Sequence, residues 1–133
     1  MSNNTDKLFK KTFTVRKQDL ANRVGSGTSP VLSSPSLLTF IEETCMASIK
    51  SILESSINNK NTCVGVKSDF YHLKPTREGE KVEVISRLIF IEKNRKLHFK
   101  VDVYNIKEST ENILISTCDH IRYLVPEDFY KIV

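Results

Sequence analysis

The chain has 133 residues, of which 39% are hydrophobic and 27% charged, as expected for one soluble globular domain with a core. No apolar run approaches the ~20 residues that cross a bilayer, so a membrane-spanning protein is not expected. The net charge is +4, but basic residues are scattered and do not interleave with aromatic ones, which argues against a nucleic-acid partner. Three widely spaced cysteines, Cys45, Cys63 and Cys118, indicate reduced thiols in a cytoplasmic protein without a metal site.

The N-terminal quarter of the chain contains one predicted strand and one loop. Residues Met1–Lys7 are polar, lack the apolar stretch of a secretion signal, and are expected to fray. Leu8–Val15 predicts the first strand, and Lys17–Arg23 predicts a short helical turn. Val24–Pro30 is rich in glycine, serine and proline, which predicts a loop and does not match a dinucleotide-binding motif.

Residues Ser33–Ser55 predict one long helix with a sharp start. The hydroxyl of Ser34 is placed to cap its first turn, and Pro35 suits the first helical position, where no amide donor is needed. Apolar side chains at helical spacing define the face that is expected to contact the core, and they are Leu38, Ile41, Cys45, Ile49, Ile52 and Leu53.

Glu42 is the unusual residue of this helix. At ~100° per residue it is expected to project into the apolar arc, whereas Glu43 and Glu54 are expected to face solvent. A carboxylate in a core costs several kcal/mol unless it is paired, hydrogen-bonded or protonated. Glu42 is therefore a paired core residue, a residue at the edge of the core whose carboxylate reaches solvent, or a functional residue.

The rest of the chain predicts four strands joined by mostly short turns. They are Thr62–Leu73, Lys81–Ile91, Lys96–Asn105 and Ile113–Val125, and the short turns indicate an antiparallel meander. Since one helix with one apolar stripe must cover one sheet, the fold class is α+β. We expect a single domain over residues 1–133, in which about five antiparallel strands wrap around one long central helix.

Four short motifs, in this order and spacing, resemble the hotdog-fold thioesterases, and more narrowly their fluoroacetyl-CoA-thioesterase-like branch. The motifs are Val31–Pro35 leading into Ile41–Cys45, then Val64–Val66, then Tyr71–Thr76, and finally Asp119–Val125. The resemblance implies a hotdog fold, hydrolysis of a small acyl-CoA to free acid and CoA, and a homodimer or a dimer of dimers. It implies no cofactor, because CoA is part of the substrate, and no membrane or nucleic-acid partner.

The resemblance also implies a set of site residues. Ser34 supplies the hydroxyl at the helix start, where the family usually has threonine, and Glu42 is the nucleophile or the general base. Gly65 offers a backbone amide to the thioester carbonyl, and His72 donates a proton or orients the other groups. Arg122 contacts the site or the substrate. An apolar setting leaves the carboxylate of Glu42 poorly hydrated and more basic.

Each of these residues also has a structural interpretation. Ser34 can be only a helix cap, Gly65 only a bulge, and His72 an ordinary histidine at a strand end. His120 and Arg122 have same-face spacing, which suits a structural pair as well as a site.

Three other residues complete the survey of candidates. Cys45 is expected to be inert because it lies on the core face of the helix. Lys74 and Arg77 flank the turn after His72 and are candidates for contact with CoA phosphates.

Two other functions compete with the thioesterase. The first is a non-catalytic protein that binds acyl-CoA or an acyl carrier in the same pocket. The second is a hotdog dehydratase, whose aspartate–histidine hydration motif is not found in this sequence. Fluoroacetyl selectivity is not expected, because no phenylalanine lies between Phe13 and Phe40, where the fluoroacetate-specific members carry phenylalanines.

Overall fold

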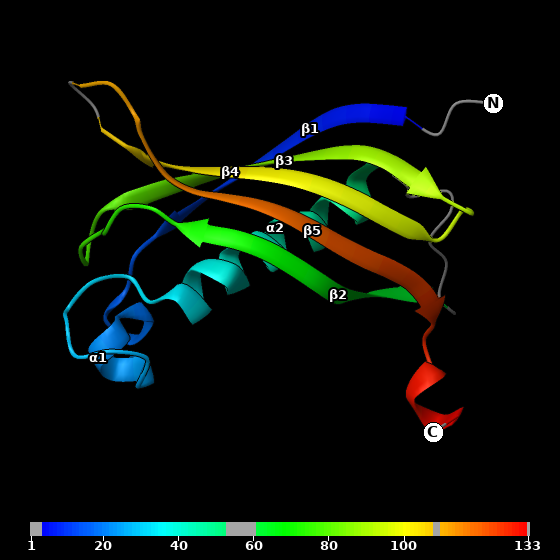
Figure 1. The fold of residues 1–133 in the computed structure, drawn as a ribbon, viewed down its shortest axis with the longest axis horizontal. Coiled ribbons are helices and arrows are strands. Elements are labelled where there is room, and N and C mark those ends of the chain that lie inside the picture. The colour runs from blue at the N-terminus through cyan, green and yellow to red at the C-terminus, as the bar shows by residue number, and fades with distance from the viewer. Residues whose placement is uncertain (1–3, 53–60, 108–109, 133) are drawn as a thin grey trace.

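The fold is a five-stranded antiparallel sheet that wraps around one long helix (Figure 1), as predicted. The computed structural model describes residues 4–52, 61–107 and 110–132. The elements are β1 (Asn4–Thr14), η1 (Lys17–Asp19), α1 (Ala21–Val24), α2 (Ser34–Ile52), β2 (Asn61–His72), β3 (Lys81–Glu92), β4 (Lys96–Ile106), β5 (Ile113–Pro126) and η2 (Phe129–Ile132).

The order of strands across the sheet is β1-β3-β4-β5-β2, with every neighbouring pair antiparallel. The meander that was predicted is found only from β3 to β5. It is wrong for β2, which pairs with β5 and forms the other edge of the sheet. The connection 73–80 is longer than a tight hairpin turn, so the chain can cross the end of the sheet before β3 begins.

Strand β1 begins earlier than the sequence predicts. Asn4 lies opposite Phe90 and Lys7 opposite Leu88, so the expected fraying is wrong for residues 4–7. The reason is that β3 continues to Glu92 and supplies backbone partners for these residues. Residues 1–3 lie outside the described chain.

The cap of α2 is Ser33, and not Ser34 as predicted. Ser33 Oγ accepts a hydrogen bond of 3.1 Å from the amide of Ser36, and its carbonyl accepts one of 3.0 Å from the amide of Leu37. A cap that bonds the third helical amide makes Ser34 the first residue of the helix and Pro35 the second. The hydroxyl of Ser34 is therefore not needed for capping.

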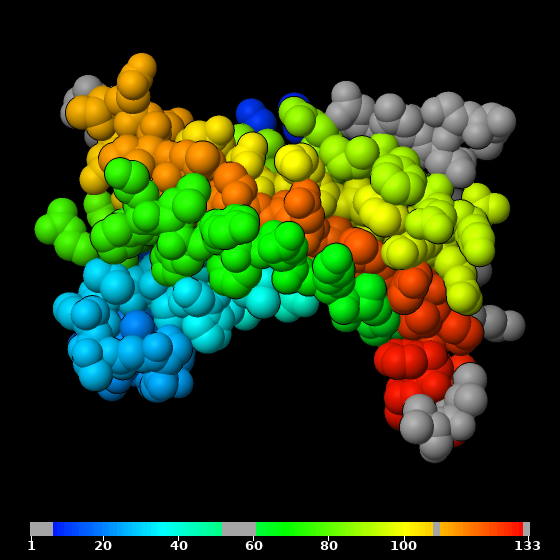
Figure 2. Space-filling view, in the orientation of Figure 1, coloured from blue at the N-terminus to red at the C-terminus, as the bar shows by residue number. Residues whose placement is uncertain are grey.

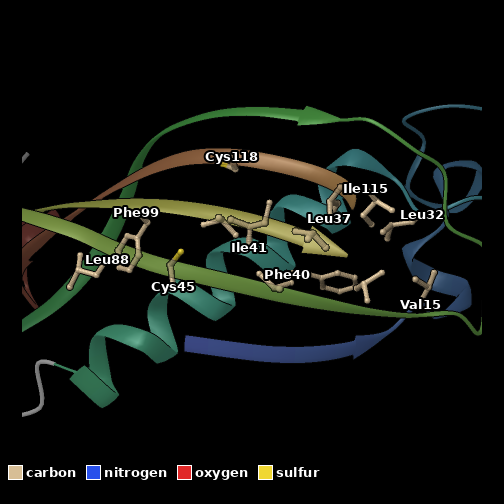
Figure 3. Packing of buried hydrophobic residues seen from close by; sticks show 14 of the residues in the cluster. Val15, Leu32, Leu37, Phe40, Ile41, Cys45, Leu88, Phe99, Ile115 and Cys118 are labelled. Atoms are coloured by element: carbon tan, nitrogen blue, oxygen red, sulfur yellow. The ribbon is translucent and has the colours of Figure 1, made fainter. Parts of the chain in front are cut away.

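Helix α2 packs one face against the concave side of the sheet (Figure 3). Phe40 stacks on Phe13 of β1 with ring centroids 4.3 Å apart. The fully buried apolar residues of the helix are Leu37, Ile41, Cys45 and Ile49, which meet Leu88, Leu97, Phe99, Val101 and Ile115 of the sheet.

The buried face of α2 is rotated from the one that the apolar pattern predicts. Thr44 and Ser48 are buried with 0% exposure, whereas Leu38 is only partly buried. The hydroxyl of Thr44 donates to the carbonyl of Phe40, which allows a polar side chain into the core. Because of this rotation, Glu42 lies at the edge of the buried arc with 45% of its side chain exposed. Its predicted place in the middle of the arc is wrong, and the alternative of an edge position is found. The expected helix end near Ser55 lies outside the described residues.

The molecule is hollowed on the side of α2 that faces away from the sheet. Figure 2 shows the α1 loop and the C-terminal η2 projecting at opposite ends, with a concave surface between them. None of the helices in the described ranges combines the length and the apolar character that a membrane crossing needs.

Candidate active site

The first group of candidate residues joins the start of α2 to the end of β2. Ser34 Oγ lies 2.9 Å from His72 Nδ1, so the two side chains share a hydrogen bond. Ser34 is exposed, and its hydroxyl is available because Ser33 caps the helix. The predicted cap role of Ser34 is therefore wrong, and its role in the site stays a prediction, with which the contact with His72 is compatible.

The second ring nitrogen of His72, Nε2, takes no part in the contact with Ser34. Nε2 is buried and has no hydrogen-bond partner among the described residues. Burial lowers the pKa of His72 below its ordinary value, so the imidazole is neutral at neutral pH. A neutral imidazole offers one donor and one acceptor, which is what proton transfer requires.

The second group joins the middle of α2 to β2 and β5. Arg122 Nη1 lies 3.8 Å from Glu42 Oε2. A methyl group at Gly65 would lie 2.7 Å from Glu42 Oε2 and 3.2 Å from Arg122 Nη1. Only a residue without a side chain lets the strand approach the carboxylate this closely. The register shifts between Gly65 and Lys67, so the strand also bulges here, and the role of the Gly65 amide in substrate binding stays a prediction.

Arg122 is fixed by buried neighbours. Its side chain is 9% exposed. Its Nε donates to Cys63 Sγ at 3.2 Å, its Nη2 donates to the Cys63 carbonyl at 3.5 Å, and its Nη1 lies 3.1 Å from His120 Nε2. These contacts hold the guanidinium in one orientation, with Nη1 toward Glu42.

His120 is the supporting residue to which the sequence could assign no single role. It is 1% exposed, and its Nδ1 lies 3.0 Å from the Lys67 carbonyl and 2.7 Å from Ser68 Oγ. Because a carbonyl only accepts, Nδ1 carries the proton and Nε2 accepts from Arg122. Burial, with the charge of Arg122, lowers the pKa of His120 to about 4, which keeps the ring neutral. In the sequence, the signal for this pair was the two-residue spacing of His120 and Arg122, which places both side chains on one face of the strand.

The two groups lie apart within one chain. Ser34 and Glu42 are eight positions apart on α2, which separates their backbones by ~12 Å along the helix axis. The structure thus brings Ser34 to His72 and Glu42 to Gly65 and Arg122, but it does not bring all five residues to one point.

The carboxylate opens into a cavity of about 500 Å³ between α2 and β1. Its lining includes the cations Lys11, Lys50 and Arg122 and the carboxylates Glu42 and Glu43, and Lys11 Nζ lies 3.7 Å from Glu43 Oε2. The space suits a small-molecule ligand.

The buried thiols of Cys45 and Cys118 are poor nucleophiles. Burial raises the pKa of Cys45 far above its ordinary value and that of Cys118 to about 12. Cys45 is fully buried, as predicted.

Comparisons with known proteins identify the family of this chain. The sequence profile of the fluoroacetyl-CoA-specific thioesterases, FlK, matches residues 15–128. A search of curated protein sequences finds no match.

Several solved structures share the fold at low sequence identity. A threonine-to-serine variant of the fluoroacetyl-CoA thioesterase FlK in complex with acetyl-CoA superposes with a TM-score of 0.80 at 16% identity, over 99% of this chain and 95% of that one. A thioesterase superfamily member from Thermus thermophilus gives 0.80 at 16% identity, over 98% and 89%. A hot-dog-like protein from Thermanaerovibrio acidaminovorans gives 0.75 at 15% identity, over 96% and 87%. At this identity the structures show the hotdog fold, and the profile match over most of the chain shows that it belongs to the fluoroacetyl-CoA-specific thioesterase family of thioester hydrolases.

Proposed function

We propose that the protein hydrolyses a small acyl-CoA to the free acid and CoA, with Glu42 as the catalytic carboxylate. The observation that carries the proposal is the approach of Gly65 and Arg122 to Glu42 at the edge of a cavity. This arrangement places a carboxylate beside the Arg122 guanidinium and the backbone of Gly65. Thioester hydrolysis requires a base and hydrogen-bond donors to the developing oxyanion. The FlK structures in complex with acetyl-CoA, or with fluoroacetate and CoA, support an acyl-CoA as the substrate.

In the general-base form of the reaction, Glu42 takes a proton from a water molecule as its oxygen attacks the thioester carbonyl carbon. The carbonyl oxygen becomes an oxyanion, which the Gly65 amide and the Arg122 guanidinium stabilise. When this intermediate collapses, the carbon–sulfur bond breaks and the thiolate of CoA leaves. His72 is the candidate proton donor to the thiolate, and the homodimer proposed below would supply it from the second subunit. In the covalent form, the Glu42 carboxylate attacks the carbonyl carbon, the carbon–sulfur bond breaks as the CoA thiolate leaves, and water then hydrolyses the anhydride to the free acid and Glu42.

Ser34 has a supporting role in either form. Its hydroxyl fixes the imidazole of His72 through the 2.9 Å hydrogen bond, and the N-terminus of α2 favours negative charge nearby. Serine lacks the β-branch of the usual family threonine, so its hydroxyl has more rotamers to lose. The absence of phenylalanine between Phe13 and Phe40 supports an acyl group other than fluoroacetyl.

We further propose a homodimer in which Ser34 and His72 of one subunit complete the site that contains Glu42 of the other. A separation of ~12 Å along one helix is too long for both residues to contact one carbonyl group. Strand β2 is an edge strand, and its exposed apolar side chains Val66 and Tyr71 suit pairing with a second β2. The hollow beside α2 leaves space for a second subunit (Figure 2).

The test of the activity is release of free thiol from a panel of short, branched and aromatic acyl-CoAs by wild type and by Glu42→Gln. We expect hydrolysis of one class and a loss of roughly 10²–10⁴-fold in the variant. If a folded protein binds CoA but hydrolyses no member of the panel, the non-catalytic binding protein is the better description. If Glu42→Gln keeps wild-type turnover, the assigned role of Glu42 is wrong.

The test of the shared site is complementation between two inactive variants. Ser34→Ala and Glu42→Gln chains with different tags are co-expressed, and the mixed dimer is purified through both tags. If each site takes Ser34 from one chain and Glu42 from the other, one intact site forms, and activity returns to about half of wild type. If each site lies within one chain, both sites carry a lesion and the mixed dimer stays inactive.

A further inference from the structure

Arg122 has one N–H group left for a ligand after its contacts within the protein are counted. A guanidinium carries five N–H groups and accepts no hydrogen bond. Nε donates to Cys63 Sγ, and the two N–H groups of Nη2 face the Cys63 carbonyl at 3.5 Å and Met46 Sδ at 4.0 Å. One N–H of Nη1 is directed to His120 Nε2 at 3.1 Å. The second N–H of Nη1 has no hydrogen-bond acceptor among the described residues, and Glu42 Oε2 is 3.8 Å from this nitrogen. This N–H is therefore the one available to a substrate oxygen atom beside Glu42.

His120 determines which way this N–H group points. The guanidinium is planar, so holding one N–H of Nη1 on His120 also fixes the direction of the other. Because Arg122 can only donate, Nε2 of the histidine ring must be unprotonated. The proton is then on Nδ1, which lies 3.0 Å from the Lys67 carbonyl and 2.7 Å from Ser68 Oγ. The contacts on the two sides of the ring therefore select the same tautomer.

The ring of His120 is confined by the strand that approaches the carboxylate. It is almost fully buried, and a methyl group at Gly65 would lie 3.2 Å from its Cε1, so the edge of the ring borders the backbone of β2. Lys67, whose carbonyl orients the ring, is the residue at which the register of β2 resumes after Gly65. The irregular stretch of β2 that comes close to Glu42 thus also supplies the acceptor that orients His120.

We propose that His120 is a positioning residue of the hydrolysis, which acts through Arg122. Its neutral ring binds one N–H of Nη1 and directs the other toward the oxyanion that forms beside Glu42. A donor that is aimed in advance at developing charge stabilises the transition state more than the bound substrate, so the contact acts on kcat rather than on KM. His120 itself contacts no reacting atom. This inference rests on the proposed thioester hydrolysis and adds one residue to its machinery.

Two replacements of His120 separate its contact with Arg122 from its contact with Lys67. In His120→Asn, the side-chain amide ends near the place of Nδ1, so it can donate to the Lys67 carbonyl but does not reach Arg122. In His120→Gln, the amide ends near the place of Nε2, so its oxygen can accept from Arg122 while the bond to Lys67 is lost. We expect kcat to fall about 10- to 100-fold in His120→Asn, with KM near the wild-type value, and to stay within about threefold of wild type in His120→Gln.

Two controls show whether the loss passes through Arg122. His98→Asn is the same replacement on β4, where His98 is partly exposed, stacks on Phe90 and pairs with Glu92, and it is expected to keep the wild-type kcat. In an Arg122→Lys background, His120→Asn is expected to add no further loss, because both changes remove the same oriented N–H group. Urea unfolding of the same samples separates a loss of kcat from a loss of stability.

The tautomer of His120 is measured independently of turnover. Nitrogen-15 NMR of the wild-type protein at pH 7 shows which ring nitrogen carries the proton, and the signal that disappears in His120→Gln identifies the residue. We expect the proton on Nδ1. A proton on Nε2 overturns the inference, and so does an equal fall in kcat in His120→Asn and His120→Gln, or a full additional loss in the Arg122→Lys background. These results refute the role of His120 alone, whereas a wild-type protein that hydrolyses no acyl-CoA refutes the proposed function.

Discussion

The replacement Gly65→Ala tests whether the short approach between β2 and Glu42 is used in catalysis. The added methyl group would lie 2.7 Å from Glu42 Oε2, whereas ordinary contact begins at 3.4 Å. The carboxylate must therefore retreat by roughly 0.7 Å, and it can do so because its side chain is flexible and 45% exposed. The contacts of 3.2 Å to Arg122 Nη1 and His120 Cε1 leave little room in those directions.

The magnitude follows from this displacement. A misplacement of about 1 Å can cost 10²-fold in rate, so kcat/KM is expected to fall roughly 10- to 100-fold, or about 1.4–2.7 kcal/mol. Stability is expected to stay within about 1 kcal/mol, since alanine loses less backbone entropy than glycine on folding. The assay is thiol release from the best acyl-CoA, together with urea unfolding of the same samples.

The control for this replacement is Gly27→Ala, where a methyl group would meet only Ala21 Cβ at the ordinary distance of 3.4 Å. This variant is expected to match wild type in both assays. In a Glu42→Gln background, Gly65→Ala is expected to add no further loss, because both changes act on one group. Wild-type kcat/KM in Gly65→Ala, or a full additional loss in the double variant, would refute the reasoning.

Two further predictions concern the start of α2 and the buried histidine. Ser33→Ala is expected to lower the free energy of unfolding by ~1 kcal/mol with kcat unchanged, whereas Ser34→Ala lowers kcat and leaves the unfolding midpoint unchanged. Thiol release measures the change in kcat and urea unfolding the change in stability, so the two assays distinguish Ser33→Ala from Ser34→Ala. Equal effects of the two variants in both assays would contradict the assignment of Ser33 as the cap. His120 binds protons more weakly when folded, so its contribution to stability falls as pH drops from 6.5 toward 4, by up to about 3 kcal/mol. The free energy of unfolding is measured at pH 7 and at pH 5, and the difference between the two values is expected to be smaller in His120→Gln than in wild type.

The sequence predicted the elements well because their signals are local. Alternation of apolar and polar residues marks β4, and tight turns or glycine and proline bound the other strands. The pairing of β2 with β5 has no local signal, because it depends on where the crossing segment 73–80 leaves the sheet. A strand's pattern shows which face is buried, but not which strand lies beside it.

The errors within the candidate site arise from single positions. Ser33 and Ser34 are adjacent hydroxyls, and only the backbone geometry decides which one caps the helix. Glu42 was assigned to the core because only apolar residues were used to define the buried face of the helix. Thr44 and Ser48 are polar but buried, and they move the centre of that face away from Glu42. The spacing of His120 from Arg122 showed that the two residues share a face, but not what His120 does. Its role depends on the Lys67 carbonyl in another strand.

The curvature of the sheet explains how one helix and one strand can meet at two places. From Ser34 to Glu42, α2 advances ~12 Å, whereas from His72 back to Gly65 an extended strand covers ~23 Å. The two lengths differ by ~11 Å, so β2 is inclined to the helix or bent around it, and the register shift between Gly65 and Lys67 marks a bulge that adds to the local twist. The site residues therefore lie along a seam between α2 and an edge strand. Such a seam is open at the sheet edge, which is where a second β2 is proposed to pair and bring the two halves of the site together.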